Sequence, residues 1–266
     1  MLLLPHAARA ADGTAARAIQ ALERKTGAQI GLAALDSGSG KTLFHRPAER
    51  FVMCSTFKLS LAAATLARAD KSSEQLDRLV MYDKPVLGVS PATTRNWPHG
   101  MTIAALCEAA IIYSDNTAAN VLLAQLGGPD AVTAFWRGIG DKTSRLDDNE
   151  PKLNIPDGVR NTTTPIAMMG NLKNLLLGES LSASSRARLL GWMHANTTGG
   201  TMLKAGLPPG WAIGDKTGRN PDPGLTNDIA IITPPARKPI LAAVHTRHAD
   251  DAVIAGVGRI LADEFA

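Results

Sequence analysis

The chain has 266 residues, which is enough to bury a full hydrophobic core without disulfide or metal staples. Hydrophobic residues make up 45% and charged residues 20% of it, a composition that excludes an intrinsically disordered protein. The net charge of +4 comes from scattered Lys and Arg, and no apolar run reaches the roughly 18 residues that span a bilayer, so we expect neither a nucleic-acid partner nor a membrane anchor.

The first ten residues have the pattern of the end of an export signal. Residues 1–4 form an apolar stub, and Ala8-Arg-Ala10 has the small-residue spacing that signal peptidase favours. We therefore interpret 1–10 as a signal-peptide remnant, and we expect a periplasmic or secreted protein. The alternative is an alanine-rich terminus with no targeting role, because a charged region before the apolar stub is missing.

Helical periodicity followed by strand signals comes next. Apolar residues recur at helical spacing over 11–24, and Thr26-Gly27 is a suitable C-cap, so we predict a helix that ends there. Two apolar runs, 30–35 and 42–44, flank the polar turn 36–40 and predict a β-hairpin.

The middle of the chain, from residue 55 to about 195, has few strand candidates. It is rich in Ala and Leu at helical spacing, and its clearest predicted helices are 59–69, 103–112, 118–126 and 131–137.

Strand signals return near the C-terminus. Three short apolar runs, 211–213, 228–232 and 240–244, predict strands, and 251–265 has a helical period.

These elements predict an α+β protein. We expect an antiparallel sheet flanked by the N- and C-terminal helices, with an all-helical domain inserted into it. The sheet domain is then discontinuous, formed by 11–50 and 196–266, the helical domain covers 51–195, and the active site lies between them.

Four short motifs occur in order along the chain. They are Ser55-Thr-Phe-Lys58, Ser114-Asp-Asn116, Glu150-Pro-Lys-Leu-Asn154 and Lys216-Thr-Gly218. Each motif is weak alone, because Lys25-Thr-Gly27 is a second copy of the last one and is best read as an ordinary helix cap. Their joint occurrence in this order is specific.

Together the motifs resemble those of the class A serine β-lactamases, and the resemblance covers essentially the whole chain after residue 10. It implies hydrolysis of the β-lactam ring of penicillins and cephalosporins through a serine acyl-enzyme, which gives antibiotic resistance. It also implies a monomer that needs no cofactor and no metal ion, and the six histidines have no zinc-binding spacing.

Two other functions share part of this motif set. One is a penicillin-binding peptidase that acts on D-Ala-D-Ala stems, and the other is a β-lactam-sensing module that is acylated without turnover. Both predict stoichiometric trapping, and neither needs Glu150 with Asn154. Those two residues favour the hydrolase, because an acyl-serine ester is stable until a general base activates water.

The residue chemistry of the first motif suits a nucleophile and its base. Ser55 and Lys58 are three residues apart, so on a helix their side chains share one face. The apolar run 51–54 predicts that Ser55 lies at a buried helix N-terminus, where backbone N–H groups stabilise developing negative charge.

The family resemblance implies a role for each further site residue. Ser114 passes a proton to the departing lactam nitrogen, Asn116 binds the acylamide carbonyl of the substrate, and Asn154 orients the hydrolytic water with Glu150. Lys216 and Thr217 bind the substrate carboxylate, and the backbone N–H of Arg219 completes the oxyanion hole with that of Ser55. Whether Lys58 or Glu150 takes the serine proton stays open.

The chain departs from the family pattern around the substrate. Val89 stands where relatives often carry an aromatic side chain. The arginines that relatives use for the carboxylate are replaced by Met202, Thr226 and Asp250. We therefore expect Arg219 or Arg247 to supply that charge.

Two further expectations concern cysteines and the loop of Glu150. Cys54 and Cys107 are predicted to be free, buried thiols. Asp148 and Asn161 occupy the positions of an Arg–Asp ion pair that closes this loop in the family, and we predict a hydrogen bond there instead.

Overall fold

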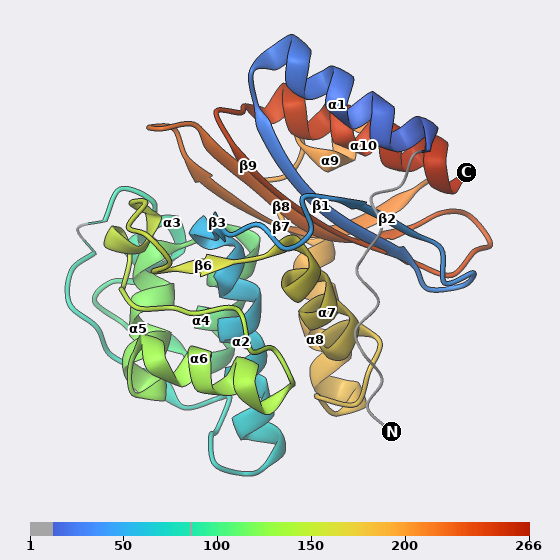
Figure 1. Cartoon of the computed structure of the whole chain (residues 1–266). Coiled ribbons are helices and arrows are strands. Elements are labelled where there is room, and N and C mark those ends of the chain that lie inside the picture. The colour runs from blue at the N-terminus through green and yellow to red at the C-terminus, as the bar shows by residue number, and fades with distance from the viewer. Residues whose placement is uncertain (1–12, 86) are drawn as a thin grey trace, which may run out of the picture.

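The computed structural model describes residues 13–85 and 87–266, so the expected signal-peptide remnant at 1–10 lies outside the described residues. Its centre is a five-stranded antiparallel sheet in the order β2-β1-β9-β8-β7 (Figure 1). The strands are β1 (Gln29–Asp36), β2 (Thr42–His45), β7 (Ala212–Asn220), β8 (Leu225–Thr233) and β9 (Ile240–Arg247). The predicted α+β fold is confirmed.

The sheet is covered on both faces because its strands alternate their buried side chains. Ala230 and Ile232 on β8 belong to the core beneath α1 (Thr14–Thr26) and α10 (Asp251–Phe265). Ile229 and Ile231, which alternate with them along the strand, belong to the core on the other face. Figure 1 shows α1 and α10 side by side on one face of the sheet, with the short α9 (Leu203–Gly206) next to α10.

The middle of the chain is mostly helical, as predicted. Its helices are α2 (Phe57–Asp70), α3 (Pro91–Asn96), α4 (Ile103–Ile112), α5 (Asn116–Leu126), α6 (Pro129–Gly138), α7 (Pro165–Leu176) and α8 (Ala183–His194). Helix α2 is central, because every residue from 57 to 66 is buried, and it contacts α4, α5, α6 and α8. None of the described helices is long and apolar enough to cross a membrane.

Two short β-ladders connect segments for which the sequence predicts no strand. β3 (Phe51–Val52) pairs with β6 (Thr162–Thr163), and β4 (Leu79–Val80) pairs with β5 (Met101–Thr102). The first ladder ties the segment before Ser55 to the end of the loop that carries Glu150.

Strand β7 is longer than predicted. The apolar run 211–213 marks only its beginning, and the strand continues through Lys216 and Gly218 to Asn220. Its polar second half is held by backbone pairing to β8, in which Gly218 lies opposite Asn227. The fourth motif, Lys216-Thr-Gly218, therefore lies on the edge strand of the sheet, in contact with the turn that carries Ser55.

Candidate active site

Ser55 lies in a 3₁₀ turn, Cys54–Thr56, that leads directly into α2. The turn is buried, as the apolar run before it predicts: Phe51, Met53 and Cys54 are all fully buried. Cys54 has a positive φ of 47°, so the chain bends sharply between β3 and the helix. The bend presents Ser55, which is half-buried, at the N-terminal end of the helix.

Lys58 is one helical turn from Ser55 and fully buried. Its Nζ lies 2.9 Å from Ser55 Oγ and 3.0 Å from Glu150 Oε1. It also donates to Ser114 O at 2.8 Å and to Asn116 Oδ1 at 2.5 Å. Burial lowers the pKa of Lys58, while the carboxylate of Glu150 opposes that shift. The amine of Lys58 therefore lies within hydrogen-bond distance of both the serine hydroxyl and the carboxylate of Glu150.

Glu150 faces Ser55 from the other side. Its Oε1 accepts a hydrogen bond from Ser55 Oγ at 3.2 Å, and its Oε2 accepts one from Asn154 Nδ2 at 2.6 Å. The side-chain oxygen Oδ1 of Asn154 is buried and has no hydrogen-bond partner among the described residues. It remains available to accept a hydrogen bond from water or from a ligand.

Asn120 holds the backbone of Glu150 and was missed by the sequence analysis. Glu150 N donates to Asn120 Oδ1, and Asn120 Nδ2 donates to Glu150 O, both at 2.9 Å. The available signal was the spacing on α5, because Asn120 follows Asn116 by four residues and so shares its face.

Ser114 lies between two lysines. Its Oγ is 3.0 Å from Lys216 Nζ and 3.5 Å from Lys58 Nζ. Burial and the nearby charge of Lys58 lower the pKa of Lys216 to about 7, although the carboxylates of Asp215 and Asp228 oppose that shift. Two buried amines and a hydroxyl thus form a continuous chain of proton donors and acceptors.

Val89 lies next to Asn116 and is exposed. Asn116 N donates to Val89 O at 2.7 Å, and the Val89 residue is 48% exposed. Asp115 caps α5 by accepting from Ala118 N at 2.9 Å, and it also accepts from Thr93 N at 2.9 Å. The Ser-Asp-Asn motif is therefore both a helix cap and part of the site.

Neither candidate arginine forms a hydrogen bond with Lys216 or Thr217 in the described part of the chain. Arg219 Nε and Nη2 pair with the carboxylate of Asp251 at 3.0 and 2.5 Å. Arg247 pairs with Glu49 at 2.6 Å. Thr217 instead exchanges a hydrogen bond of 2.5 Å with Thr198, which the sequence analysis did not identify.

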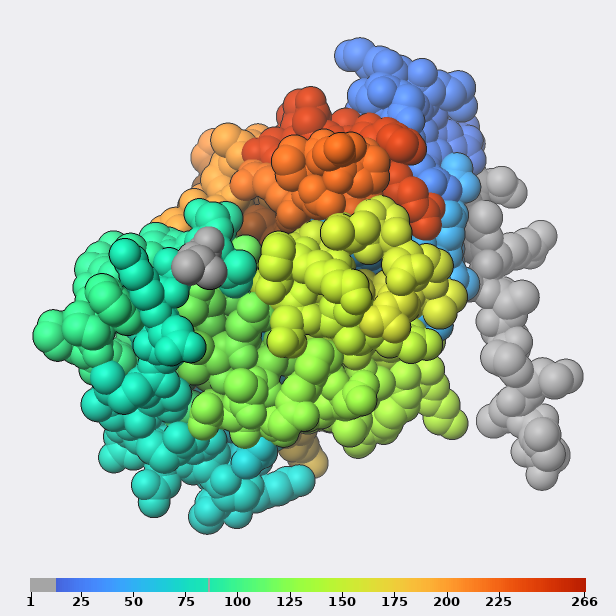
Figure 2. All heavy atoms as spheres, turned by 90° about the vertical axis from the view of Figure 1, so that its left-hand side faces the viewer, coloured from blue at the N-terminus to red at the C-terminus, as the bar shows by residue number. Residues whose placement is uncertain are grey.

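The loop that carries Glu150 is tied to the end of β7. Asn220 Nδ2 donates to Asn154 O at 2.9 Å. In Figure 2 this loop, coloured yellow, lies directly below the orange turn that follows β7. The contact joins the two segments that carry the third and fourth motifs.

Both cysteines are free and buried, as predicted. Burial raises the pKa of the Cys54 thiol, and it raises that of Cys107 to about 12. Both side chains therefore behave as small apolar groups.

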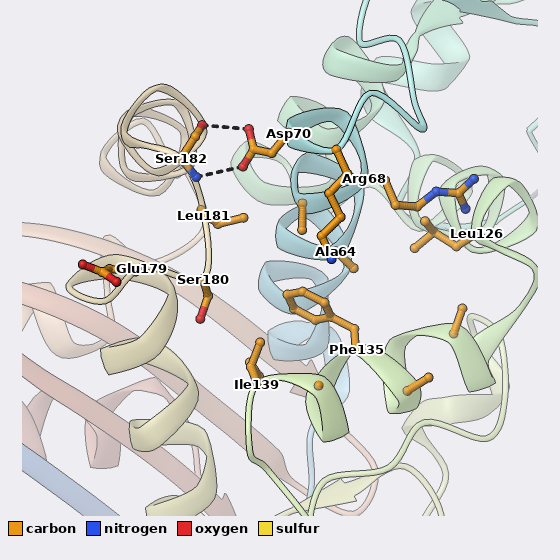
Figure 3. A pocket seen from close by; sticks show the side chains of 15 residues that line it. Ala64, Arg68, Asp70, Leu126, Phe135, Ile139, Glu179, Ser180, Leu181 and Ser182 are labelled. Atoms are coloured by element: carbon orange, nitrogen blue, oxygen red, sulfur yellow. Dashed lines mark hydrogen bonds between the residues drawn. The ribbon is translucent and has the colours of Figure 1, made fainter.

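A cavity of about 660 Å³ lies at the far end of α2 (Figure 3). It contains none of the motif residues, and the residues that line it include Ala64, Phe135 and Leu181. The carboxylate of Asp70 on its rim accepts hydrogen bonds from Ser182. Within the described part of the chain, no cluster of three or more His, Cys, Asp or Glu side chains could hold a metal ion.

Comparisons with known proteins agree on one family. The model of the family described as "Beta-lactamase enzyme family" matches residues 14–265. Beta-lactamase CTX-M-8 of Citrobacter amalonaticus is 42% identical over 256 residues, which cover 93% of this chain and 88% of that protein. Carbapenem-hydrolyzing beta-lactamase KPC of Klebsiella oxytoca is 46% identical over 248 residues, 90% of this chain and 85% of that one. The structure of an ancestral (GNCA) class A β-lactamase is 49% identical, with a TM-score of 0.92 over 95% of this chain and 100% of that chain.

Proposed function

The chain belongs to the class A β-lactamases and hydrolyses the β-lactam ring, and we propose that Ser55 is the nucleophile that attacks the ring carbonyl. One observation carries this assignment: Ser55 Oγ lies 2.9 Å from Lys58 Nζ and 3.2 Å from Glu150 Oε1. A hydroxyl becomes a nucleophile only when a base can take its proton, and two bases are within hydrogen-bond distance.

In acylation, the serine proton goes to Lys58 or to Glu150, because both groups lie within hydrogen-bond distance of Ser55 Oγ. The carbonyl oxygen of the ring gains negative charge as Ser55 attacks. We assign its stabilisation to the backbone N–H groups of Ser55 and Arg219. The position of Gly218 supports this pair, because a Cβ on Gly218 would lie 3.0 Å from Ser55 N. Ser114, whose hydroxyl oxygen accepts a hydrogen bond from Lys216, then donates a proton to the departing ring nitrogen.

In deacylation, Glu150 acts as the general base. The carboxylate removes a proton from a water molecule that attacks the acyl-serine ester, and Asn154 orients that water. Support comes from the free Oδ1 of Asn154 and from the bond of its Nδ2 to Glu150.

The remaining residues bind substrate. We assign the acylamide carbonyl to Asn116 and the carboxylate to Lys216 and Thr217, since a buried ammonium and a hydroxyl are matched to an anion. Arg219 adds positive charge at the edge of this subsite, where Asp251 holds it. Arg247 is the weaker candidate, because its guanidinium contacts Glu49, the backbone of Arg50 and the Phe51 ring. Arg219, in contrast, follows Lys216 and Thr217 on the same strand.

The domain division and the state of the protein in the cell are further proposals. The sheet domain is 11–50 with 196–266, and the helical domain is 51–195. The cluster of buried apolar side chains around α1 and α10 supports this division, because all of its members lie in 11–50 or 196–266. The cluster around α2 joins the helical domain to the other face of the sheet, where it includes Ile229 and Ile231. We propose that the protein is periplasmic or secreted, because residues 1–10 have the pattern of an export signal. We also propose that it is a monomer, as the family resemblance implies.

Hydrolysis of a chromogenic cephalosporin, followed in parallel by intact mass spectrometry, tests the assignment. We expect turnover, with no adduct left when substrate is exhausted, and complete loss of both turnover and labelling in Ser55→Ala. Ser182→Ala, which changes an exposed serine at the start of α8, is the control and should behave as wild type. A stoichiometric adduct without turnover would instead support the peptidase or the sensing module.

A further inference from the structure

Asn227 on β8 has a fully buried amide side chain. It lies next to residues 52–55, which end at Ser55 and are called the nucleophile segment below. It lies directly opposite Gly218 of β7 in the antiparallel register. Paired residues on neighbouring strands project their side chains to the same face of a sheet. Asn227 and the Cα of Gly218 therefore face the same side, which is the side of the turn that carries Ser55.

The amide of Asn227 is fully engaged by backbone groups. Its Nδ2 donates to Val52 O at 2.9 Å and to Met53 O at 3.0 Å. Its Oδ1 accepts a hydrogen bond from Thr246 N on β9 at 2.9 Å. One side chain thus joins β9 to the two carbonyls that precede Cys54 and Ser55.

Gly218 lets the strand approach the same segment closely. A Cβ at this position would lie 2.8 Å from Met53 O, closer than real Cβ atoms come, and 3.0 Å from Ser55 N, which is tighter than most real Cβ contacts. The space for the nucleophile segment is therefore provided by Gly218, and the hydrogen bonds that hold it are provided by Asn227.

The segment is also held from the opposite side. Met53 N donates to Asn161 O at 3.0 Å, where the loop of Glu150 ends. The position of Ser55 N relative to β7 is consequently set by bonds to β8 on one side and to the loop on the other. Among these, the bonds of Asn227 are the ones that come from the strand paired with β7.

We propose that Asn227 is a positioning residue that sets the separation between the two halves of the oxyanion hole, the N–H of Ser55 and the N–H of Arg219. This inference rests on the proposed function, because it takes Ser55 as the nucleophile. Oxyanion donors act on charge that develops in the transition state. The loss of Asn227 should therefore slow acylation and weaken binding of tetrahedral adducts, and change ground-state affinity little.

Asn227→Asp tests the donor with nearly unchanged side-chain volume. A carboxylate still accepts from Thr246 N, but it places an oxygen against two carbonyl oxygens. We expect the acylation rate, measured by rapid quench and intact mass, to fall about 100-fold, because small misplacements of reacting groups have effects of that size. The affinity for an aryl boronic acid, which forms a tetrahedral adduct with the serine, should fall in parallel. The dissociation constant of the cephalosporin before acylation should change less than about threefold.

Asn171→Asp is the matched control. Asn171 is also buried, lies on α7 and donates to Asp141 Oδ2 at 2.7 Å. Its substitution should lower the melting temperature by a comparable amount without changing the boronic acid affinity of the folded enzyme. If it weakens boronic acid binding as much as Asn227→Asp does, the effect is one of stability and the proposal fails.

Gly218→Ala provides a second route if Asn227→Asp does not fold. The added methyl group lies on β7 and would push residues 53–55 away from that strand. We therefore expect the same selective loss of acylation and of boronic acid binding. Acylation within threefold of wild type in either folded variant would overturn the proposal. If wild-type Ser55 itself is never labelled, the proposed function fails instead, and the two outcomes are thereby distinguished.

Discussion

Asn161 Nδ2 donates a hydrogen bond of 3.0 Å to Asp148 Oδ2, across the two ends of the loop that carries Glu150. The hydrogen bond predicted from the sequence in place of an ion pair is thus confirmed. The amide oxygen of Asn161 also accepts from Asp148 N at 3.0 Å, so the two residues are joined twice. Lys152 and Arg160 add ion pairs of 2.8 and 2.9 Å to Asp148 that the sequence analysis did not identify.

Asn161→Asp should destabilise the loop. The change replaces a donor by a carboxylate beside the nearly buried carboxylate of Asp148, whose pKa is held low by Lys152 first and by Asn161 next. We expect a loss of about 1–3 kcal/mol of folding free energy and slower deacylation, measured by thermal melting and by the lifetime of the acyl-enzyme.

The pH dependence and a swap variant check this explanation. The penalty should be largest at neutral pH and shrink as pH falls toward about 4, because one of the two carboxyl groups then takes up a proton. Adding Asp148→Asn to Asn161→Asp exchanges the partners and should recover much of the stability. An Asn161→Asp enzyme with wild-type stability and acyl-enzyme lifetime would show that the bond has no mechanical role.

Patterns within one segment could be predicted from the sequence, whereas contacts between distant segments could not. Helix α10 spans the predicted 251–265, and the glycine cap of α1 at Gly27 has the expected left-handed φ of 75°. The length of strand β7 was underestimated, because its second half is polar and lacks the apolar pattern that predicts a strand. This half is held in the sheet by backbone pairing with β8.

The candidate site follows the same rule. The four motifs identified its main residues, because their spacing and order carry that information. The bond between Asn120 and Glu150 joins residues 30 apart, and that between Arg219 and Asp251 joins residues 32 apart. The local sequence indicates at most that Asn120 shares a helix face with Asn116. It does not indicate the partner of Asn120 or of Arg219, because that depends on how the helices, the loop and the sheet pack together.

Asn120→Ala should impair deacylation more than acylation. The variant loses both hydrogen bonds to the backbone of Glu150. Two lost bonds at a partly buried site correspond to about 1–3 kcal/mol, which is roughly a 5- to 150-fold slower release of the acyl group if the base is displaced. Asn174→Ala, which removes a bond of 2.9 Å to Ile139 O in the helical region, is the matched control. Equal effects of both variants on the deacylation rate would argue against a role for Asn120.

Arg219→Ala should mainly raise KM for substrates that carry a carboxylate. Its guanidinium is partly exposed and shared with Asp251, so we expect the effect near the lower end of the range of about 1.5–3 kcal/mol for a charged hydrogen bond. Arg247→Ala should lower stability and leave KM unchanged, because that side chain pairs with Glu49 and lies over the Phe51 ring. The reverse pattern in steady-state kinetics would assign the carboxylate to Arg247.

The pKa of Lys216, lowered to about 7, predicts a pH-dependent KM. Below this pH the side chain is an ammonium and attracts the substrate carboxylate. As pH rises through the pKa the charge is lost, so KM for a penicillin should increase on the alkaline side. The methyl ester of the same penicillin lacks the anion, and its KM should stay flat. A rise of equal size for both compounds would show that another group titrates.

The role of Glu150 as deacylation base is the central claim, and the intact mass of Glu150→Gln after mixing with a good penicillin tests it most directly. The amide keeps the size of the side chain but cannot accept a proton, and loss of a general base slows a reaction by about 100- to 10,000-fold. We predict a long-lived adduct of one substrate mass on Ser55, absent from Ser55→Ala. Turnover at the wild-type rate with no accumulated adduct would contradict the account.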